Sequence, residues 1–133
     1  PKKSPFNKIF GDSHLELEFA SFLENCDDII SYVKNYFAVQ FKIDYRNATG
    51  EISNFFPDFI IKKSEKEMYI VETKGREDLD DPLKIQRLAQ WCEDINQNQN
   101  KVKFNWLFIK EDEFKKDKIR SFKDLMKLFI KKI

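Results

Sequence analysis

The sequence predicts an α/β domain in which helices flank a mixed sheet, and two observations support this prediction. Apolar residues recur at helical spacing in three segments, and they alternate or form continuous runs in four others. These segments follow one another in the order α-β-β-β-α-β-α, and a strand meander followed by a helical crossover to a further strand gives a mixed sheet with helices packed against it. The 133 residues suffice for one domain, expected to span residues 1–133.

The first helix is expected over residues 13–35. Apolar side chains from Leu15 to Val33 recur there at three- and four-residue steps, which is the period of a helix with one buried face. Asp12 or Ser13 is the expected N-cap, because a short polar side chain can accept a hydrogen bond from the first helical turn.

Three antiparallel strands are expected next. Residues 37–45 alternate between apolar and polar, and residues 47–50 read Asn-Ala-Thr-Gly, which is a turn sequence. Residues 52–62 and 68–74 are strand-like runs, and the charged residues 63–67 between them predict a solvated turn. The three runs together predict a meander.

The second half of the chain predicts a helix, a strand and a helix. Asp81 is the expected N-cap of the middle helix, with Pro82 at its first position and its end near residue 96. A fourth strand is expected over residues 102–109, and the apolar stripe in residues 119–133 predicts a C-terminal helix.

Composition excludes several classes of protein. A chain that is 41% hydrophobic and 15% aromatic is not a disordered tail. Cys26, Cys92 and the single His14 lack the paired spacing of a structural zinc site. No apolar run approaches the ~20 residues that span a bilayer, and the first residues lack the apolar core of a signal peptide. We therefore expect a soluble, cytoplasmic protein.

The charge of the chain is unevenly distributed. The formal net charge is +1, but residues 101–133 carry 11 basic against 5 acidic side chains, a local excess of +6. Such a basic segment can follow a phosphate backbone. A solvated helix face explains the same lysines equally well.

Three residues of the expected second and third strands suit divalent-cation chemistry. Asp58 follows Pro57, where the strand is expected to splay because proline donates no ladder hydrogen bond. Glu72 and Lys74 share one face of the next strand. Two carboxylates at the end of a hairpin suit Mg²⁺, and a lysine beside them can orient a water or counter charge on a phosphate. A lone Glu-x-Lys, however, is more often an ordinary surface pair.

Glu16 extends this set. It lies inside the apolar sector of the first helix, together with Phe19, Ala20 and Leu23. A carboxylate on a buried face needs a partner, and a metal-bound water would serve. Glu18 lies at the border of the stripe and is expected to be solvated.

These residues form a pattern that resembles the PD-(D/E)XK nuclease superfamily, whose restriction-endonuclease-like core has the order α-β-β-β-α-β. Within it, the chain is similar to the C-terminal endonuclease domain of type III restriction enzyme Res subunits and related helicase-fused nucleases. The stretches that carry the resemblance are Ser13-His14-Leu15-Glu16 with Phe19-Ala20, Val33-Lys34-Asn35, Ile43-Asp44-Tyr45, Phe56-Pro57-Asp58-Phe59-Ile60, Val71-Glu72-Thr73-Lys74-Gly75, and Lys84 with Trp91-Cys92 and Asn96.

The resemblance implies a Mg²⁺-dependent DNA endonuclease, with Mn²⁺ as the expected substitute cation. It implies that Asp58 and Glu72 ligate the metal together with the Thr73 carbonyl. Lys74 would orient the attacking water, and Glu16 would support the metal through a water.

The resemblance also implies partners. They are DNA, a helicase motor in the same full-length chain, and a Mod subunit that supplies methyltransferase activity and sequence specificity; no membrane is implied. Residues 1–133 would then be the cutting domain of a larger protein.

Other roles and functions stay open. Lys84 matches a position that the relatives commonly fill with lysine, although an ordinary first-turn helix lysine fits equally well. Arg76 and Lys62 are further candidates for contact with phosphate. The basic C-terminal segment also fits a non-catalytic DNA-binding or docking module on the same fold, and a resolvase or mobile-element nuclease would keep the chemistry in another context.

Overall fold

The computed structural model describes residues 2–5, 14–35, 39–75, 78–116 and 119–130. The elements in chain order are α1 (His14–Asn25), β1 (Ser31–Lys34), β2 (Ile43–Arg46), β3 (Ile52–Phe55), β4 (Phe59–Ser64), β5 (Glu67–Lys74), α2 (Asp81–Asn98), β6 (Lys103–Lys110), α3 (Glu111–Lys116) and α4 (Phe122–Ile130).

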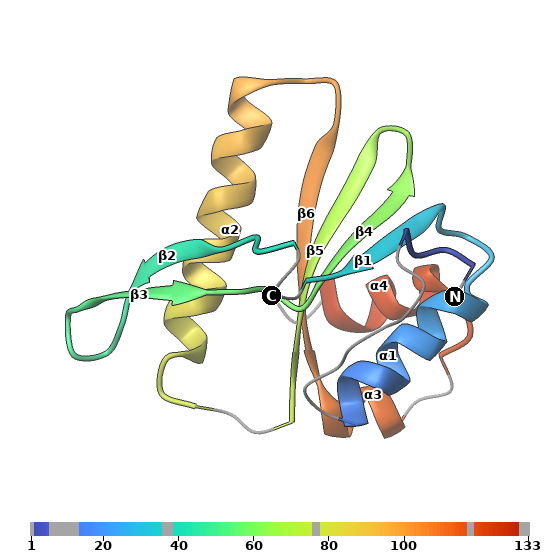
Figure 1. Cartoon of the computed structure of the whole chain (residues 1–133), viewed down its shortest axis with the longest axis horizontal. Helices are drawn as coiled ribbons and strands as arrows, with labels where there is room; N and C mark the ends of the chain where they lie inside the picture. The colour runs from blue at the N-terminus through green and yellow to red at the C-terminus, as the bar shows by residue number, and fades with distance from the viewer. Residues whose placement is uncertain (1, 6–13, 36–38, 76–77, 117–118, 131–133) are drawn as a thin grey trace.

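A four-stranded mixed sheet forms the centre of the molecule, in the order β1-β4-β5-β6 (Figure 1). β1, β4 and β5 pair antiparallel, whereas β6 runs parallel to β5, to which α2 connects it. The strands β2 and β3 form a separate antiparallel hairpin beside α2. The predicted α/β class, with a mixed sheet flanked by helices, is confirmed.

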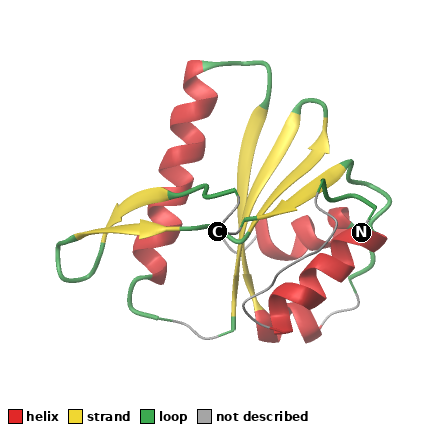
Figure 2. Cartoon of the chain, in the orientation of Figure 1, coloured by secondary structure: helices red, strands yellow, loops and turns green. Residues whose placement is uncertain are grey.

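Helices cover both faces of the sheet (Figure 2). On one face, α1, α3 and α4 pack on a core that includes Phe19, Phe59, Val71 and Leu125. On the other face, α2 and the β2–β3 hairpin enclose a core that includes Ile70. Since β5 is covered on both sides, its residues 69–73 are all buried, as the apolar run of a central strand predicts.

The first helix is shorter than predicted, because α1 ends at Asn25 and residues 31–34 form β1. Two acidic residues follow the helix, where they oppose its dipole. One of them, Asp28, instead accepts hydrogen bonds from the backbone N–H groups of Phe122 and Lys123. Asp28 thus caps α4, a tertiary contact that local periodicity does not reveal.

The predicted three-stranded meander is wrong. The run 52–62 breaks at Pro57 into β3, which pairs with β2, and β4, which lies between β1 and β5. Of the expected strand 37–45, residues 43–45 belong to β2, residues 39–42 are not a strand, and residues 37–38 lie outside the described residues. Buried Asn35 explains part of the break at Pro57. Its side-chain N–H group donates to the Pro57 carbonyl, and its backbone N–H donates to the Asp58 carbonyl.

The second half follows the prediction more closely. α2 begins at Asp81, so Asp80 and not Asp81 occupies the N-cap position, and Pro82 lies in the first turn. Of the predicted C-terminal helix 119–133, residues 122–130 form α4 and residues 131–133 lie outside the described residues. The short helix α3 precedes this segment and was not predicted. Within the part of the chain that the structure describes, no helix is both long and apolar enough to cross a membrane.

Candidate active site

Asp58, Glu72 and Lys74 meet at one end of the β4–β5 hairpin. Asp58 directly precedes β4, whose first residue Phe59 pairs with Val71. Glu72 and Lys74 follow Val71 at the end of β5. The antiparallel register therefore brings the predicted acids and the lysine together, although they are separated along the chain.

The carboxylate of Asp58 is held by Thr73. Oδ2 of Asp58 accepts a hydrogen bond from the Thr73 backbone N–H at 2.8 Å and another from the Thr73 hydroxyl at 2.7 Å. The sequence analysis assigned Thr73 a role through its carbonyl. The structure shows that its amide and hydroxyl orient Asp58, a role that the motif alone does not indicate.

Three carboxylates from three elements form a row with Asp58 at its centre. Asp58 is within hydrogen-bonding reach of Glu16 on α1 and of Glu72 on β5, and both glutamates are buried. Burial, and after it the charge of Asp58, raises the pKa of Glu72 to about 10. Burial also raises the pKa of Glu16, while Lys34 opposes that rise. Without a cation, Glu72 therefore keeps its proton at neutral pH.

A lysine lies at each end of this carboxylate row. Nζ of Lys34 is 2.8 Å from Oε1 of Glu16, and Nζ of Lys74 is 3.8 Å from Oε2 of Glu72. The prediction that Glu16 is buried and needs a partner is confirmed. The partner in the structure is Lys34, which the sequence analysis did not assign to the site.

Lys74 is shared among several carboxylates. Besides Glu72, its Nζ lies 3.6 Å from Asp78 and 3.8 Å from the buried Asp81. Burial lowers the pKa of Lys74, but the charges of Glu72, Asp81 and Asp78 outweigh that effect, so the net shift is upward. Lys74 is consequently a cation at neutral pH, and it can position or polarise groups but cannot act as a base.

The structure brings Lys84 to the site as well. Its Nζ lies 3.7 Å from Asp78 and within 6 Å of the ring centroids of Tyr45 and Phe55, at 5.9 and 5.7 Å. The positive charge of Lys84 also acts on Glu72. The β2–β3 hairpin therefore borders the site through these two rings.

One other predicted residue, Lys62, is not found there. Lys62 lies four positions along the chain from Asp58 and pairs with Glu65, at 3.2 Å, in the turn at the opposite end of the β4–β5 hairpin. Arg76 lies outside the described residues.

The carboxylate row fits a divalent cation between Asp58 and Glu72. Oε1 of Glu72 is buried and has no hydrogen-bond donor in the described structure. The charge of Asp58 also raises the cost of ionising Glu72, and a bound cation would remove that cost. Among the residues that are described, no three His, Cys, Asp or Glu side chains gather closely enough to enclose a metal. Mg²⁺ needs only one or two carboxylates, because it keeps several of its waters.

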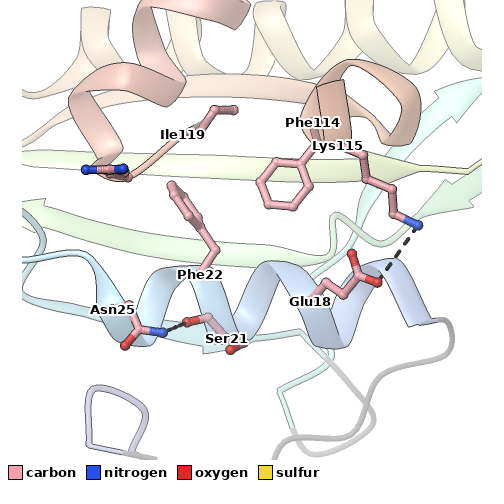
Figure 3. Close-up of a pocket in the computed structure, with 8 residues that line it drawn as sticks. Glu18, Ser21, Phe22, Asn25, Phe114, Lys115 and Ile119 are labelled. Carbon is pink, nitrogen blue, oxygen red and sulfur yellow. Dashed lines mark hydrogen bonds and ion pairs between the residues drawn. The ribbon is translucent and has the colours of Figure 1, made fainter. Parts of the chain in front are cut away.

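A cavity of about 720 Å³, which no residue of this row lines, lies between α1 and the side chains of Phe114, Lys115, Ile119 and Arg120 (Figure 3). Phe22 of α1 stacks edge to face on Phe114 there, and Glu18 pairs with Lys115 at 3.8 Å. Glu18 and Glu16 are two residues apart on α1, yet only Glu16 is buried. Glu18 is paired, and its side chain is about one-third exposed, so it serves as a matched control for Glu16.

The sequence analysis gave no site role to Lys34 and Asn35, although both lie in a stretch that carries the resemblance, and it gave none to Asp81. A polar residue inside a predicted buried element indicates a role at a site. Lys34 and Asn35 did not give this signal, because they were assigned to the end of a helix. Asp81 was explained as a helix cap.

Comparison with known proteins identifies the family of the chain. Neither the curated proteins nor the solved structures that were compared include a significant match. A family model described as an endonuclease domain matches residues 2–125, which is most of the chain and includes the whole carboxylate row. The chain therefore belongs to this family of endonuclease domains.

Proposed function

We propose that this domain is a Mg²⁺-dependent endonuclease that hydrolyses phosphodiester bonds in DNA, with Asp58 and Glu72 as metal ligands. The observation that carries the proposal is the convergence of Asp58, Glu72 and Lys74 at one end of the β4–β5 hairpin, in a chain of this family. The buried, donor-free oxygen of Glu72 supports a cation at that place.

The bound cation would supply Lewis-acid stabilisation of the scissile phosphate and a lower pKa for the attacking water. The protein supplies the geometry. Thr73 holds Asp58 through two hydrogen bonds, and Glu72 is fixed by its place in a central strand. Lys74 keeps its charge among three carboxylates and would orient the water or counter the charge that develops on the phosphate.

Type III restriction is the context that the sequence resemblance favours. In that context a helicase motor in the same full-length chain brings the domain to its DNA, and a Mod subunit supplies recognition. Reading the residues that flank this segment in the full gene tests the context independently of the chemistry. Helicase motifs there would support the Res-like placement, and transposition or resolvase functions would contradict it.

A plasmid cleavage assay with Lys74→Met tests the function. Met keeps the length of the side chain and removes its charge. The matched control is Lys63→Met, because Lys63 pairs with Glu67 at the opposite end of the hairpin. With protein in excess over supercoiled plasmid and Mg²⁺ or Mn²⁺ present, the wild type and Lys63→Met should nick the DNA. Lys74→Met should be slower by about 100-fold or more. Equal nicking by all three proteins would refute the assignment, and metal-independent DNA binding without nicking would favour a docking module.

A further inference from the structure

Lys34 is a buried charge that contacts the carboxylate row through Glu16. Its side chain is 3% exposed, and its Nζ lies 2.8 Å from Glu16 and donates a 2.9 Å hydrogen bond to the Asn35 carbonyl. The same ammonium group is 5.7 Å from the ring centroid of Phe59. A lysine is buried this deeply only when its charge is paired, since desolvation costs several kcal/mol.

The two ends of the row differ in how well the lysines neutralise them. At one end, Lys34 and Glu16 form a close pair from which solvent is excluded. At the other end, Lys74 is 3.8 Å from Glu72, is 20% exposed and is shared with Asp78 and Asp81. Among the described residues, none donates a hydrogen bond to Oε1 of Glu72. The negative charge that a further cation would neutralise therefore lies at Glu72 and Asp58.

We propose that Lys34 takes the place of a second metal ion at Glu16, so that the site holds a single divalent cation, between Asp58 and Glu72. Lys34 is a positioning residue: it neutralises Glu16, and Glu16 in turn contacts Asp58. This inference rests on the proposed function, and it assigns a number of ions and a role for Lys34 that the proposed function leaves open.

The number of Mn²⁺ ions bound, measured by calorimetry and by electron paramagnetic resonance, tests the proposal. The wild type should bind one ion at the row. Glu16→Gln should still bind one ion, with its affinity changed by less than about tenfold, the lower limit for removing an outer-shell partner. The matched control Glu18→Gln should behave as the wild type. Two ions in the wild type, one of them lost in Glu16→Gln, would overturn the proposal.

Lys34→Met gives the complementary test, because it exposes Glu16 to a cation. A second, weaker Mn²⁺ site should appear in Lys34→Met, stay absent in Lys34→Arg, and disappear again in the double variant Lys34→Met/Glu16→Gln. If Lys34→Met does not fold, the double variant removes both charges and still reports the number of ions. Unchanged Mn²⁺ binding in Glu72→Gln would refute the proposed function, whereas the Glu16 and Lys34 variants test only the single-cation proposal.

Discussion

Thr73 donates two hydrogen bonds to the same oxygen of Asp58, one from its backbone N–H at 2.8 Å and one from its hydroxyl at 2.7 Å. This pair links the break before β4 to the end of β5. It holds the Asp58 carboxylate between Glu16 and Glu72, where none of the three lysines of the site forms a described ion pair with it.

Removing the Thr73 hydroxyl should therefore weaken cation binding. Thr73→Val keeps the shape of the side chain and the backbone donor, but Asp58 loses one of its two orienting bonds. We expect the Mn²⁺ affinity to fall by about tenfold, as for other outer-shell substitutions. Calorimetric titration measures it, and Thr73→Ser should restore most of the affinity. Equal affinity in Thr73→Val and the wild type would show that the hydroxyl does not orient Asp58.

Cation binding should release a proton from Glu72. Its pKa of about 10 means that the carboxyl is protonated at neutral pH until a cation displaces the proton. Between pH 6 and pH 9 the Mn²⁺ affinity should therefore rise with pH, by up to about tenfold per pH unit. Titrations in two buffers of different ionisation enthalpy give the number of protons released. A heat of binding that is independent of the buffer, or an affinity that does not change with pH, would contradict this expectation.

Glu72→Gln should stabilise the cation-free protein. The folded state holds the Glu72 proton more tightly than the unfolded state, so stability is lost as the pH rises above the unfolded value of 4.5 and toward about 10. Gln has no such ionisation. At pH 8 in EDTA, we expect the free energy of unfolding of Glu72→Gln to exceed that of the wild type by at least about 1.4 kcal/mol, the equivalent of one pKa unit. Urea denaturation measures it. The difference should shrink at pH 4, and a less stable variant at pH 8 would contradict the ionisation argument.

Asn35 should be important for stability, because it joins three segments beside the site. Its side chain donates to the carbonyls of Phe41 and Pro57, at 2.6 and 2.8 Å, and accepts from the Phe41 N–H at 3.0 Å. Asn35→Ala leaves these buried backbone groups without that partner, so we expect a loss of about 2–3 kcal/mol in urea denaturation. Asn54→Ala, an exposed position on β3, is the control and should change stability by less than about 0.5 kcal/mol. Equal effects of the two substitutions would refute the role of Asn35.

The sequence predicted those features that depend on local periodicity. Strand alternation places Glu72 and Lys74 on one face, and the charged turn at residues 63–67 predicts a hairpin that brings them to Asp58; both are confirmed. Helical spacing also predicted that Glu16 is buried.

The features that the sequence did not predict depend on partners far along the chain. Asp28 caps α4, whose first residue lies 94 positions away. Residues 31–34, just after Asp28, form β1, although their apolar spacing fits a helix. Asn35 bonds to Pro57, 22 residues away. Lys34 was therefore assigned to a helix, and its pairing with Glu16 could not be foreseen.

Mn²⁺ binding by Asp58→Asn tests the central claim most directly, because Asp58 joins both glutamates. Asn keeps the size of the side chain and its ability to accept from Thr73, but removes the charge. The matched control is Asp44→Asn, at an exposed position on β2. The account predicts one Mn²⁺ ion in the wild type and in Asp44→Asn. The affinity of Asp58→Asn should be lower by at least about 100-fold, because losing a ligand should cost no less than losing an outer-shell partner. Equal Mn²⁺ affinity in all three proteins would contradict a metal site at Asp58.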